Sequence, residues 1–323
     1  MIFIKKPILV TGIHRSGTTF TGKMLSLNKN IGYIFEPFNP EYGLKYFDKY
    51  FKYLTENNMT KLDYKIINNL INLKEAKYNK LKIYEQDSGI KKIIKIMFRL
   101  LFKSKNNLKY RYIKYNPIID RLLIKDPIAC LSSEFLHNYF DMEVLVLVRH
   151  PLSFIGSIKK LNWDFNFDNF IIQKDLMNEQ LFSFKNEIEE MNNNNVDIVK
   201  KGVLLWNCIY YVLYNYIKRN PQFLVIKHEK LSTEPIVTFK YLYEKLNLNF
   251  DQEVVKKINN YTNEKNKIEP NNNKAHNLKR NSKSIINSWK YRLNNDEIEY
   301  IIKNTKEISG KLYDKPPEKI FNL

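Results

Sequence analysis

The sequence predicts an α/β fold: a three-layer sandwich with a central, mainly parallel sheet flanked by helices. Short apolar runs alternate with stretches of helical periodicity along most of the chain, which is typical of such a fold. The run VLVLV, residues 144–148, is apolar without alternation, as expected of a strand buried on both faces. With 323 residues, 44% of them hydrophobic, the chain is sufficient for one elaborated domain spanning residues 1–323.

The first elements are expected within the N-terminal forty residues. An apolar run predicts a strand at Pro7–Thr11, followed by a glycine-containing turn and a helix at Thr18–Leu27. A second strand is expected at Ile31–Phe35, and it should end at Glu36 because a proline follows. Residues 41–115 then show helical patterns without a recognisable strand, and we interpret them as a helical insertion within the domain.

The rest of the chain returns to alternating strands and helices. The further expected strands are Arg121–Ile124, Glu143–Val148 and Phe223–Ile226, and the expected helices are Leu152–Leu161, Gln180–Glu190, Leu204–Lys218, Pro235–Leu246 and Asp296–Ser309. The segment Asn263–Ser284 is polar, basic and rich in turn-forming residues, so we expect a mobile surface loop there.

Composition restricts the partners and the compartment. The formal net charge is +19, and so basic a surface attracts nucleic acid, an anionic membrane or a multiply charged nucleotide. A general compositional bias towards Lys, Asn and Ile is the alternative explanation for this charge.

The cysteine count and the absence of targeting signals bear on the compartment. Two cysteines cannot form a disulfide framework or a thiolate metal site. The N-terminus lacks the pattern of a cleavable leader, and no run of 18 apolar residues occurs. We therefore expect a cytoplasmic protein that needs no metal.

The segment TGIHRSGTTF, residues 11–20, carries the strongest functional signal. It lies between a predicted strand and a predicted helix, where backbone N–H groups and the helix dipole bind phosphate oxygens. Gly12 and Gly17 let the backbone curl around an anion. The segment is similar to the loop of P-loop ATPases, so a P-loop-like sheet is expected, but Thr18 replaces the lysine that reaches the β and γ phosphates, and Arg15 enters instead. This exchange favours a donor with fewer phosphates at this end.

A second anion site is expected near the middle of the chain. Arg149 directly follows the strand predicted at residues 143–148, and Ser157 comes eight residues later on the first turns of the next helix. Both side chains can therefore converge on one anion beside the N-terminus of that helix.

Together these segments resemble the sulfotransferases that use 3′-phosphoadenosine 5′-phosphosulfate (PAPS), in their bacterial carbohydrate and tyrosylprotein-like branch. The string RSGTT looks like the 5′-phosphosulfate loop of that family, and Arg149 with Ser157 looks like its 3′-phosphate motif. LLIKDP (122–127), FLVIKHEKL (223–231) and SWKYRL (288–293) extend the resemblance and leave 41–115 unmatched. The resemblance implies PAPS as donor and 3′,5′-bisphosphoadenosine (PAP) as product. The donor-binding residues it implies are Arg15, Ser16, Gly17, Thr18, Thr19, Phe20, Arg149, Ser157, Lys279 and Arg280.

Two of these assignments have structural alternatives. Phe20 occupies the position where an aromatic stacks on adenine in many members, but at helical spacing it could equally belong to the core. Lys279 and Arg280, with Ser282, could close over the 3′-phosphate, or the basic loop could simply face solvent. Trp206 and Trp289 are expected in the core.

The catalytic residues that the resemblance implies are Glu36, Arg15 and Lys125. Sulfuryl transfer needs in-line geometry and charge stabilisation, and Arg15 with the loop amides is placed to offset charge on the leaving phosphate, with Lys125 as a second candidate. The acceptor must lose a proton, and Glu36, which ends the second predicted strand, is the best candidate base. His14 and His228 are alternative bases.

The segment GIKKIIKIMFRLLFKSK, residues 89–105, predicts an amphipathic helix with no acidic residue. We expect its apolar face to pack on the domain; the alternative is a helix that lies on an anionic membrane as a peripheral contact, which would favour a lipid-linked glycan or a glycolipid as acceptor. In either case we expect the acceptor to be a carbohydrate or a glycolipid. The sequence identifies neither the acceptor nor the oligomeric state. Two other functions stay open: a P-loop kinase, and a basic protein that binds membranes or nucleic acid without catalysis.

Overall fold

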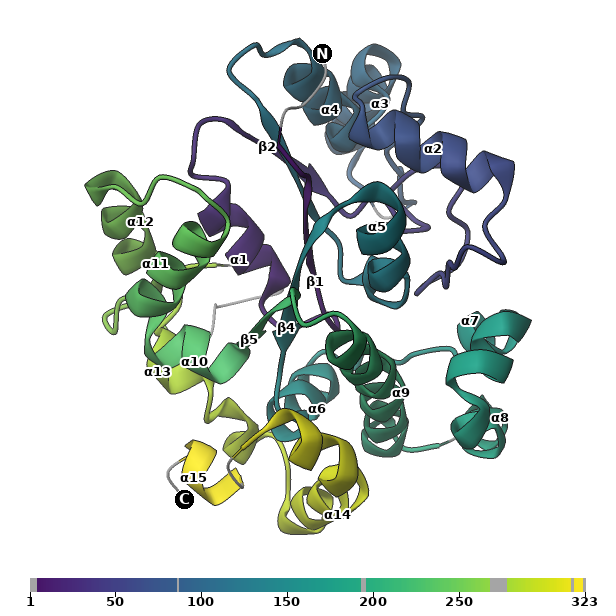
Figure 1. The fold of residues 1–323 in the computed structure, drawn as a ribbon, viewed down its shortest axis with the longest axis vertical. Helices are drawn as coiled ribbons and strands as arrows, with labels where there is room; N and C mark the ends of the chain where they lie inside the picture. Colours follow the sequence, from purple (N-terminus) through teal and green to yellow (C-terminus); the bar gives the residue numbers. More distant parts are fainter. Residues whose placement is uncertain (1–4, 86, 193–195, 268–277, 315–316, 322–323) are drawn as a thin grey trace. The chain divides into compact units, whose positions relative to one another are not determined.

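The computed structural model describes residues 5–85, 87–192, 196–267, 278–314 and 317–321 (Figure 1). The described part of the chain contains one five-stranded sheet in the order β2-β3-β1-β4-β5. The strands are β1 (Ile8–Thr11), β2 (Ile31–Phe35), β3 (Arg121–Lys125), β4 (Glu143–Val148) and β5 (Leu224–Lys227). Helices flank this sheet, which confirms the predicted α/β fold.

The contacts divide the chain into two compact units. Unit 1 comprises Met1–Thr11 and Lys29–Val144, and unit 2 comprises Gly12–Asn28 and Leu145–Leu323. Each unit is described by itself below.

In unit 1, three strands pair in parallel, β2 with β3 and β3 with β1. Their side chains are almost all buried, which explains why most of these residues are apolar; the buried Arg121 and Lys125 at the two ends of β3 are exceptions. The helical elements of this unit are α2 (Lys61–Ile71), α3 (Gly89–Phe102), α4 (Lys105–Tyr115), the 3-10 turn η1 (Ile128–Ser132) and α5 (Ser133–Phe140). Helix α4 packs on β2, and its residues Tyr110 and Ile113 are buried there.

The insertion predicted at residues 41–115 corresponds to part of unit 1. Within its described residues, helices α2, α3 and α4 begin only at residue 61, and residues 41–60 form turns and irregular segments. Helix α2 starts where Thr60 and Asp63 form a capping box, in which each side chain accepts from the other residue's backbone N–H.

In unit 2, β4 and β5 pair in parallel, and α6 (Pro151–Lys160), α9 (Ile198–Arg219) and α14 (Asn295–Leu312) pack against one another. The predicted core residues Trp206 and Trp289 are both buried. The other helical elements are α1 (Thr18–Leu25), α7 (Asp168–Ile171), the π-turn η2 (Leu176–Gln180), η3 (Phe182–Phe184), α8 (Lys185–Asn192), α10 (His228–Thr233), α11 (Pro235–Lys245), α12 (Gln252–Thr262), α13 (Ser282–Ile285), η4 (Ser288–Tyr291) and α15 (Pro317–Phe321).

Several predicted boundaries in unit 2 differ from the structure. The helix expected at 180–190 begins at Lys185, because the preceding residues form a π-turn and a 3-10 turn. Helix α9 begins at Ile198 rather than at 204, because the Asp197 side chain accepts hydrogen bonds from the first backbone N–H groups of the helix. Of the loop predicted at 263–284, residues 268–277 lie outside the described residues. Among the described helices, none combines the length and the apolarity that crossing a bilayer requires.

Candidate active site

The loop between β1 and α1 has a backbone that only particular residues tolerate. Gly12 has φ 128°, and a Cβ there would lie 2.2 Å from the Leu147 carbonyl oxygen. Gly17, with φ 97°, is the N-cap of α1 and provides no capping side chain, so the first amides of the helix are not capped by that residue. Between them Arg15 has φ 68°, a left-handed conformation that is rare outside glycine and frequent at functional sites. This loop suits an anion at a helix N-terminus.

Arg149 lies at the end of β4, and α9 holds its backbone. The Tyr210 hydroxyl accepts from the Arg149 N–H at 2.9 Å, and the Trp206 indole N–H donates to the Arg149 carbonyl at 2.9 Å. Both aromatic side chains are fully buried, so the peptide that carries Arg149 is fixed by the core.

The predicted residues from the two motifs meet in unit 2. The Arg149 guanidinium donates to the Arg15 carbonyl oxygen, and Arg15 Nε donates to Ser157 Oγ at 3.2 Å. Arg149 is buried, and its Nε has no hydrogen-bond partner among the described residues. The buried Ser16 hydroxyl also lacks one among them. Buried polar groups of this kind are normally satisfied, so the pattern fits a site that binds a polar ligand.

The electrostatics of this cluster favour an anion. Burial, followed by the neighbouring Arg280 and Arg292, lowers the pKa of Arg15 to about 10. Burial, then Arg15, lowers the pKa of Arg149 to about 9, with Arg292 also contributing. The charged forms of these arginines are therefore destabilised, both by burial and by repulsion between neighbouring guanidinium groups. A bound phosphate or sulfate would offset that cost.

Sequence reasoning missed two residues of this cluster. Arg292 belongs to the segment SWKYRL, which resembles the family as a whole and gave no separate role to its arginine. Glu229 is a buried carboxylate that accepts hydrogen bonds from the His150 N–H at 3.1 Å and the Tyr313 hydroxyl at 2.9 Å. Burial raises the pKa of Glu229. Its place within the string KHEKL, residues 227–231, gave no signal beyond that of an ordinary surface acid.

The remaining donor-binding candidates are distributed as follows. Thr18 and Thr19 form the first turn of α1. The Phe20 ring packs edge-on against Phe239 at 5.6 Å between centroids. Lys279 is exposed, whereas Arg280 is half-buried and contributes to the electrostatics at Arg15.

The two alternative bases are weak ones. Both ring nitrogens of His14 are shielded from solvent, and burial, then Arg15, lowers its pKa to about 3. Burial, then Arg149 and Arg15, also lowers the pKa of His228 well below its usual value. Both rings are therefore neutral at pH 7 and poor proton acceptors, because efficient general bases have a pKa near the working pH.

Glu36 and Lys125 form a second cluster, which lies in unit 1. Lys125 is the last residue of β3, and Glu36 directly follows the adjacent strand β2. Both are buried, and the Lys125 ammonium donates to Glu36 Oε1. Glu36 Oε2 accepts from Asn39 Nδ2 at 3.0 Å and from the Tyr42 hydroxyl at 2.5 Å. Burial, then Glu36, raises the pKa of Tyr42, so its hydroxyl stays protonated and keeps donating.

The backbone at Glu36 is also unusual. Glu36 has φ 43°, a left-handed conformation, and Pro37 follows it. Asp126, next to Lys125 in sequence, fixes the turn after Glu36 by accepting from the Phe38 N–H at 2.7 Å. Burial, then Glu36, raises the pKa of Asp126 to about 7. A strained acidic residue whose carboxylate is held from several sides is typical of a functional position.

A parallel α/β sheet with a cluster of arginines at a strand–helix turn is the arrangement expected of the class of proteins that bind anionic compounds. Comparison with known families makes this specific, because the model of the sulfotransferase domain matches residues 5–314. The chain therefore belongs to the sulfotransferase family. Within the described residues, no group of three or more His, Cys, Asp or Glu side chains is arranged to hold a metal ion.

Comparison with solved structures gives matches at low sequence identity. The sulfotransferase domain from the curacin biosynthetic pathway is 13% identical, with a TM-score of 0.46 over 94% of this chain and 99% of that chain. Sulfotransferase STF9 from Mycobacterium avium is 14% identical, with a TM-score of 0.43 over 97% of this chain and 78% of that chain. A search of the curated proteins found no match.

Proposed function

We propose that the protein transfers the sulfuryl group of PAPS to a hydroxyl, or an amine, of an acceptor that is a carbohydrate or a glycolipid. The observation that carries the donor assignment is the convergence of Arg15, Arg149 and Ser157 in unit 2, two motifs separated by more than a hundred residues. A donor with anionic groups at both its 5′ and 3′ positions fits such a cluster of guanidinium groups.

The residues of the first loop would hold the 5′-phosphosulfate. Arg15 and the amides that open α1 are positioned for this anion, and they would offset the negative charge that grows on the 5′-phosphate as it leaves. Arg149 and Ser157 would hold the 3′-phosphate. Arg280 and Arg292 add positive charge to the same site.

We assign the base to Glu36. When the acceptor oxygen forms its bond to sulfur and the sulfur–oxygen bond to the 5′-phosphate breaks, the acceptor proton would pass to this carboxylate. A carboxylate has about four lone-pair positions, and Asn39, Tyr42 and Lys125 use three of them. Oε1 therefore keeps the capacity to accept a proton. The Lys125 ammonium, which donates to that same oxygen, would stabilise the negative charge of the sulfuryl group during its transfer.

Isothermal titration with PAP, 5′-AMP and ATP tests the donor assignment. PAP should bind far more tightly than ATP. Arg149→Ala should weaken PAP about 10- to 100-fold and 5′-AMP less, because PAP loses a charge-assisted contact to its 3′-phosphate, whereas 5′-AMP is affected only through the hydrogen bond from Arg149 to the Arg15 carbonyl. Lys257→Ala, on the exposed face of α12, is the control and should change neither affinity.

Two outcomes would contradict the proposal. A preference for ATP, with magnesium dependence and no benefit from a 3′-phosphate, would indicate a kinase-like protein. Salt-sensitive binding to polyanions that survives Arg15→Ala, without any PAP binding, would indicate a basic binding protein.

A further inference from the structure

Helix α3 presents its apolar face to solvent. Among the residues that the structure describes, α3 contains none that is buried, and Ile90 and Leu100 are 75% and 78% exposed. The other large apolar side chains on this face, also exposed, are Ile93, Ile94, Met97 and Leu101. They recur at intervals of three and four, so they form one stripe along the helix. The expectation that this face packs on the domain is therefore wrong.

Ion pairs and backbone contacts explain how the helix is oriented. Asp87, just before α3, pairs with Lys91 at 2.8 Å and with Lys95 at 2.5 Å. At the other end, the Leu81 N–H donates to the Lys103 carbonyl at 2.8 Å. The side of α3 that carries Lys95 thus contacts the protein, and the apolar stripe lies away from it.

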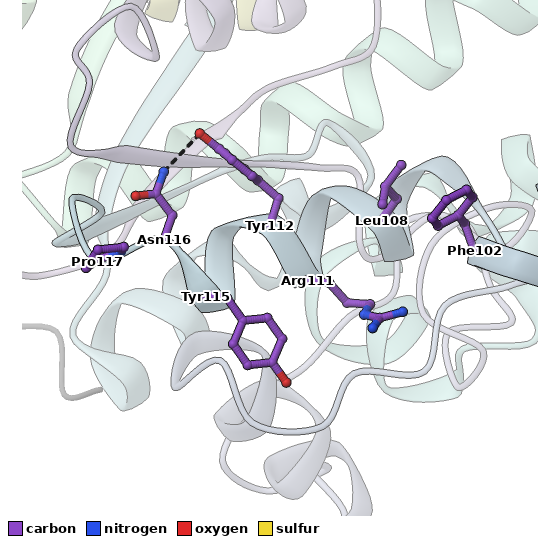
Figure 2. A pocket seen from close by; sticks show the side chains of 7 residues that line it. All are labelled: Phe102, Leu108, Arg111, Tyr112, Tyr115, Asn116 and Pro117. Carbon is purple, nitrogen blue, oxygen red and sulfur yellow. Dashed lines mark hydrogen bonds between the residues drawn. The ribbon is translucent and has the colours of Figure 1, made fainter.

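A pocket lies along the neighbouring helix α4, and its lining includes Phe102 of α3 but none of the described residues of the stripe. It has a volume of about 570 Å³ and is lined mainly by Phe102, Leu108, Arg111, Tyr112 and Tyr115 (Figure 2). Tyr112 and Tyr115 are 66% and 72% exposed. Arg111 and Tyr115 project from the same side of the helix, so the pocket combines an apolar lining with one cationic group.

The charge of the segment decides what binds there. Between residues 89 and 118 the sequence contains nine lysine or arginine residues and no acidic residue. A second copy of the chain would bring an equally positive face and be repelled, whereas an anionic bilayer complements both the charge and the apolar stripe. Exposed tyrosines are also favoured at the boundary between lipid and water.

We infer that α3 and the adjacent α4 pocket form a docking surface for a membrane rich in anionic phospholipid. A helix of 14 residues is about 21 Å long, shorter than the hydrocarbon layer, so α3 would lie in the plane of the interface with its stripe towards the acyl chains. In the pocket, Arg111 would take the phosphate of a headgroup and the aromatic lining its apolar part.

Vesicle co-sedimentation with the full-length protein tests this inference. Vesicles of phosphatidylcholine with about 30% phosphatidylglycerol should bind at least ~10-fold more protein than phosphatidylcholine alone, and added salt should reduce the difference. The triple variant I93S/M97S/L100S keeps every charge but removes part of the stripe, and it should bind ~10-fold less.

The matched control is I172S/V237S, which changes two side chains that are 54% and 61% exposed elsewhere and should bind as the wild type does. Unchanged binding of the triple variant, or equal binding to neutral vesicles, would overturn the inference. Loss of a dimer in the triple variant by sedimentation velocity, without vesicle binding by the wild type, would assign the face to self-association instead. Melting temperatures verify folding, and the assay needs no donor, so its failure leaves the sulfotransferase proposal standing.

Discussion

At the residue scale, two of the proposed catalytic residues occupy backbone conformations that cost energy. Arg15 and Glu36 both have positive φ, at 68° and 43°. A non-glycine residue in this region costs roughly 1 kcal/mol or more and persists where its surroundings impose it. The contacts differ: the Arg15 carbonyl accepts from Arg149, whereas the Glu36 side chain is held by Lys125, Asn39 and Tyr42. In both cases the contacts hold a strained backbone and thereby fix the position of a charged residue, the Arg15 cation or the Glu36 carboxylate.

Glu36→Gln is expected to lower the transfer rate about 100-fold or more while PAP affinity stays nearly unchanged, because the amide cannot accept the proton of the acceptor. The variant should also be less stable by about 3 kcal/mol, since the buried Lys125 loses its anionic partner. Turnover, titration calorimetry and urea unfolding measure the three effects.

Glu41→Gln is the control, because this nearby glutamate is exposed and should leave all three unchanged. If Glu36→Gln retained full turnover, the base would have to be sought elsewhere.

At the element scale, the sequence predicted which residues share a helix face better than it predicted where that face points. For α9 the periodic apolar residues are buried, and Trp206 is at its centre. For α3 an equally clear period gives a stripe that faces solvent. Periodicity reports which side chains lie together, whereas orientation depends on contacts such as those of Asp87, which are made outside the helix.

The start of α6 provides a pH-dependent element. Its N-cap is His150, whose ring accepts from the Leu152 N–H, and burial lowers the pKa of this histidine to about 3. In the unfolded chain the His150 ring takes up a proton near pH 6.5, whereas in the folded protein it does so only near pH 3. The contribution of His150 to the free energy of unfolding is therefore highest above pH 6.5, and it falls as the pH is lowered, by about 2 kcal/mol at pH 5.

His150→Asn and His150→Ala should both remove this part of the pH dependence of unfolding between pH 7.5 and 5. Asn keeps a capping acceptor, so at pH 7.5 only the alanine variant should show the added loss of a cap, about 1 kcal/mol. Urea unfolding at several pH values measures both quantities. A slope identical to that of the wild type in both variants would show that His150 is not the titrating group.

At the scale of the whole molecule, short sequence motifs and apolar periodicity were sufficient to predict the fold and the cluster of Arg15, Arg149 and Ser157. The loop at residues 11–20 and the spacing from Arg149 to Ser157 predicted residues that the structure brings together. Glu229 and Arg292 were not predicted, because each acts on residues distant in sequence and has no motif of its own. The same applies to the paired aromatic residues of α9. Tyr42 was not predicted either, although its partner Glu36 is only six residues away, because a single tyrosine in a tyrosine-rich segment gives no signal.

PAP should protect the chain from hydrogen exchange in a defined pattern. Amides of residues 12–28 and 149–157 are expected to exchange more slowly with saturating PAP, because binding stabilises the conformations that contact it. Amides of α3 and α4 should be unaffected. Exchange measured by mass spectrometry, with and without PAP, gives this map, and uniform or absent protection would contradict the proposed donor site.

The hydrogen bonds that Tyr210 and Trp206 form with the Arg149 backbone have a consequence for how nucleotide specificity can change by mutation. A guanidinium whose backbone is clamped in the hydrophobic interior needs little ordering when its ligand arrives. If Arg149 binds the 3′-phosphate as proposed, discrimination between nucleotides with and without this phosphate would depend partly on two core aromatic residues. Mutations in the interior, and not only at the surface that meets the ligand, can retune which nucleotide this enzyme accepts.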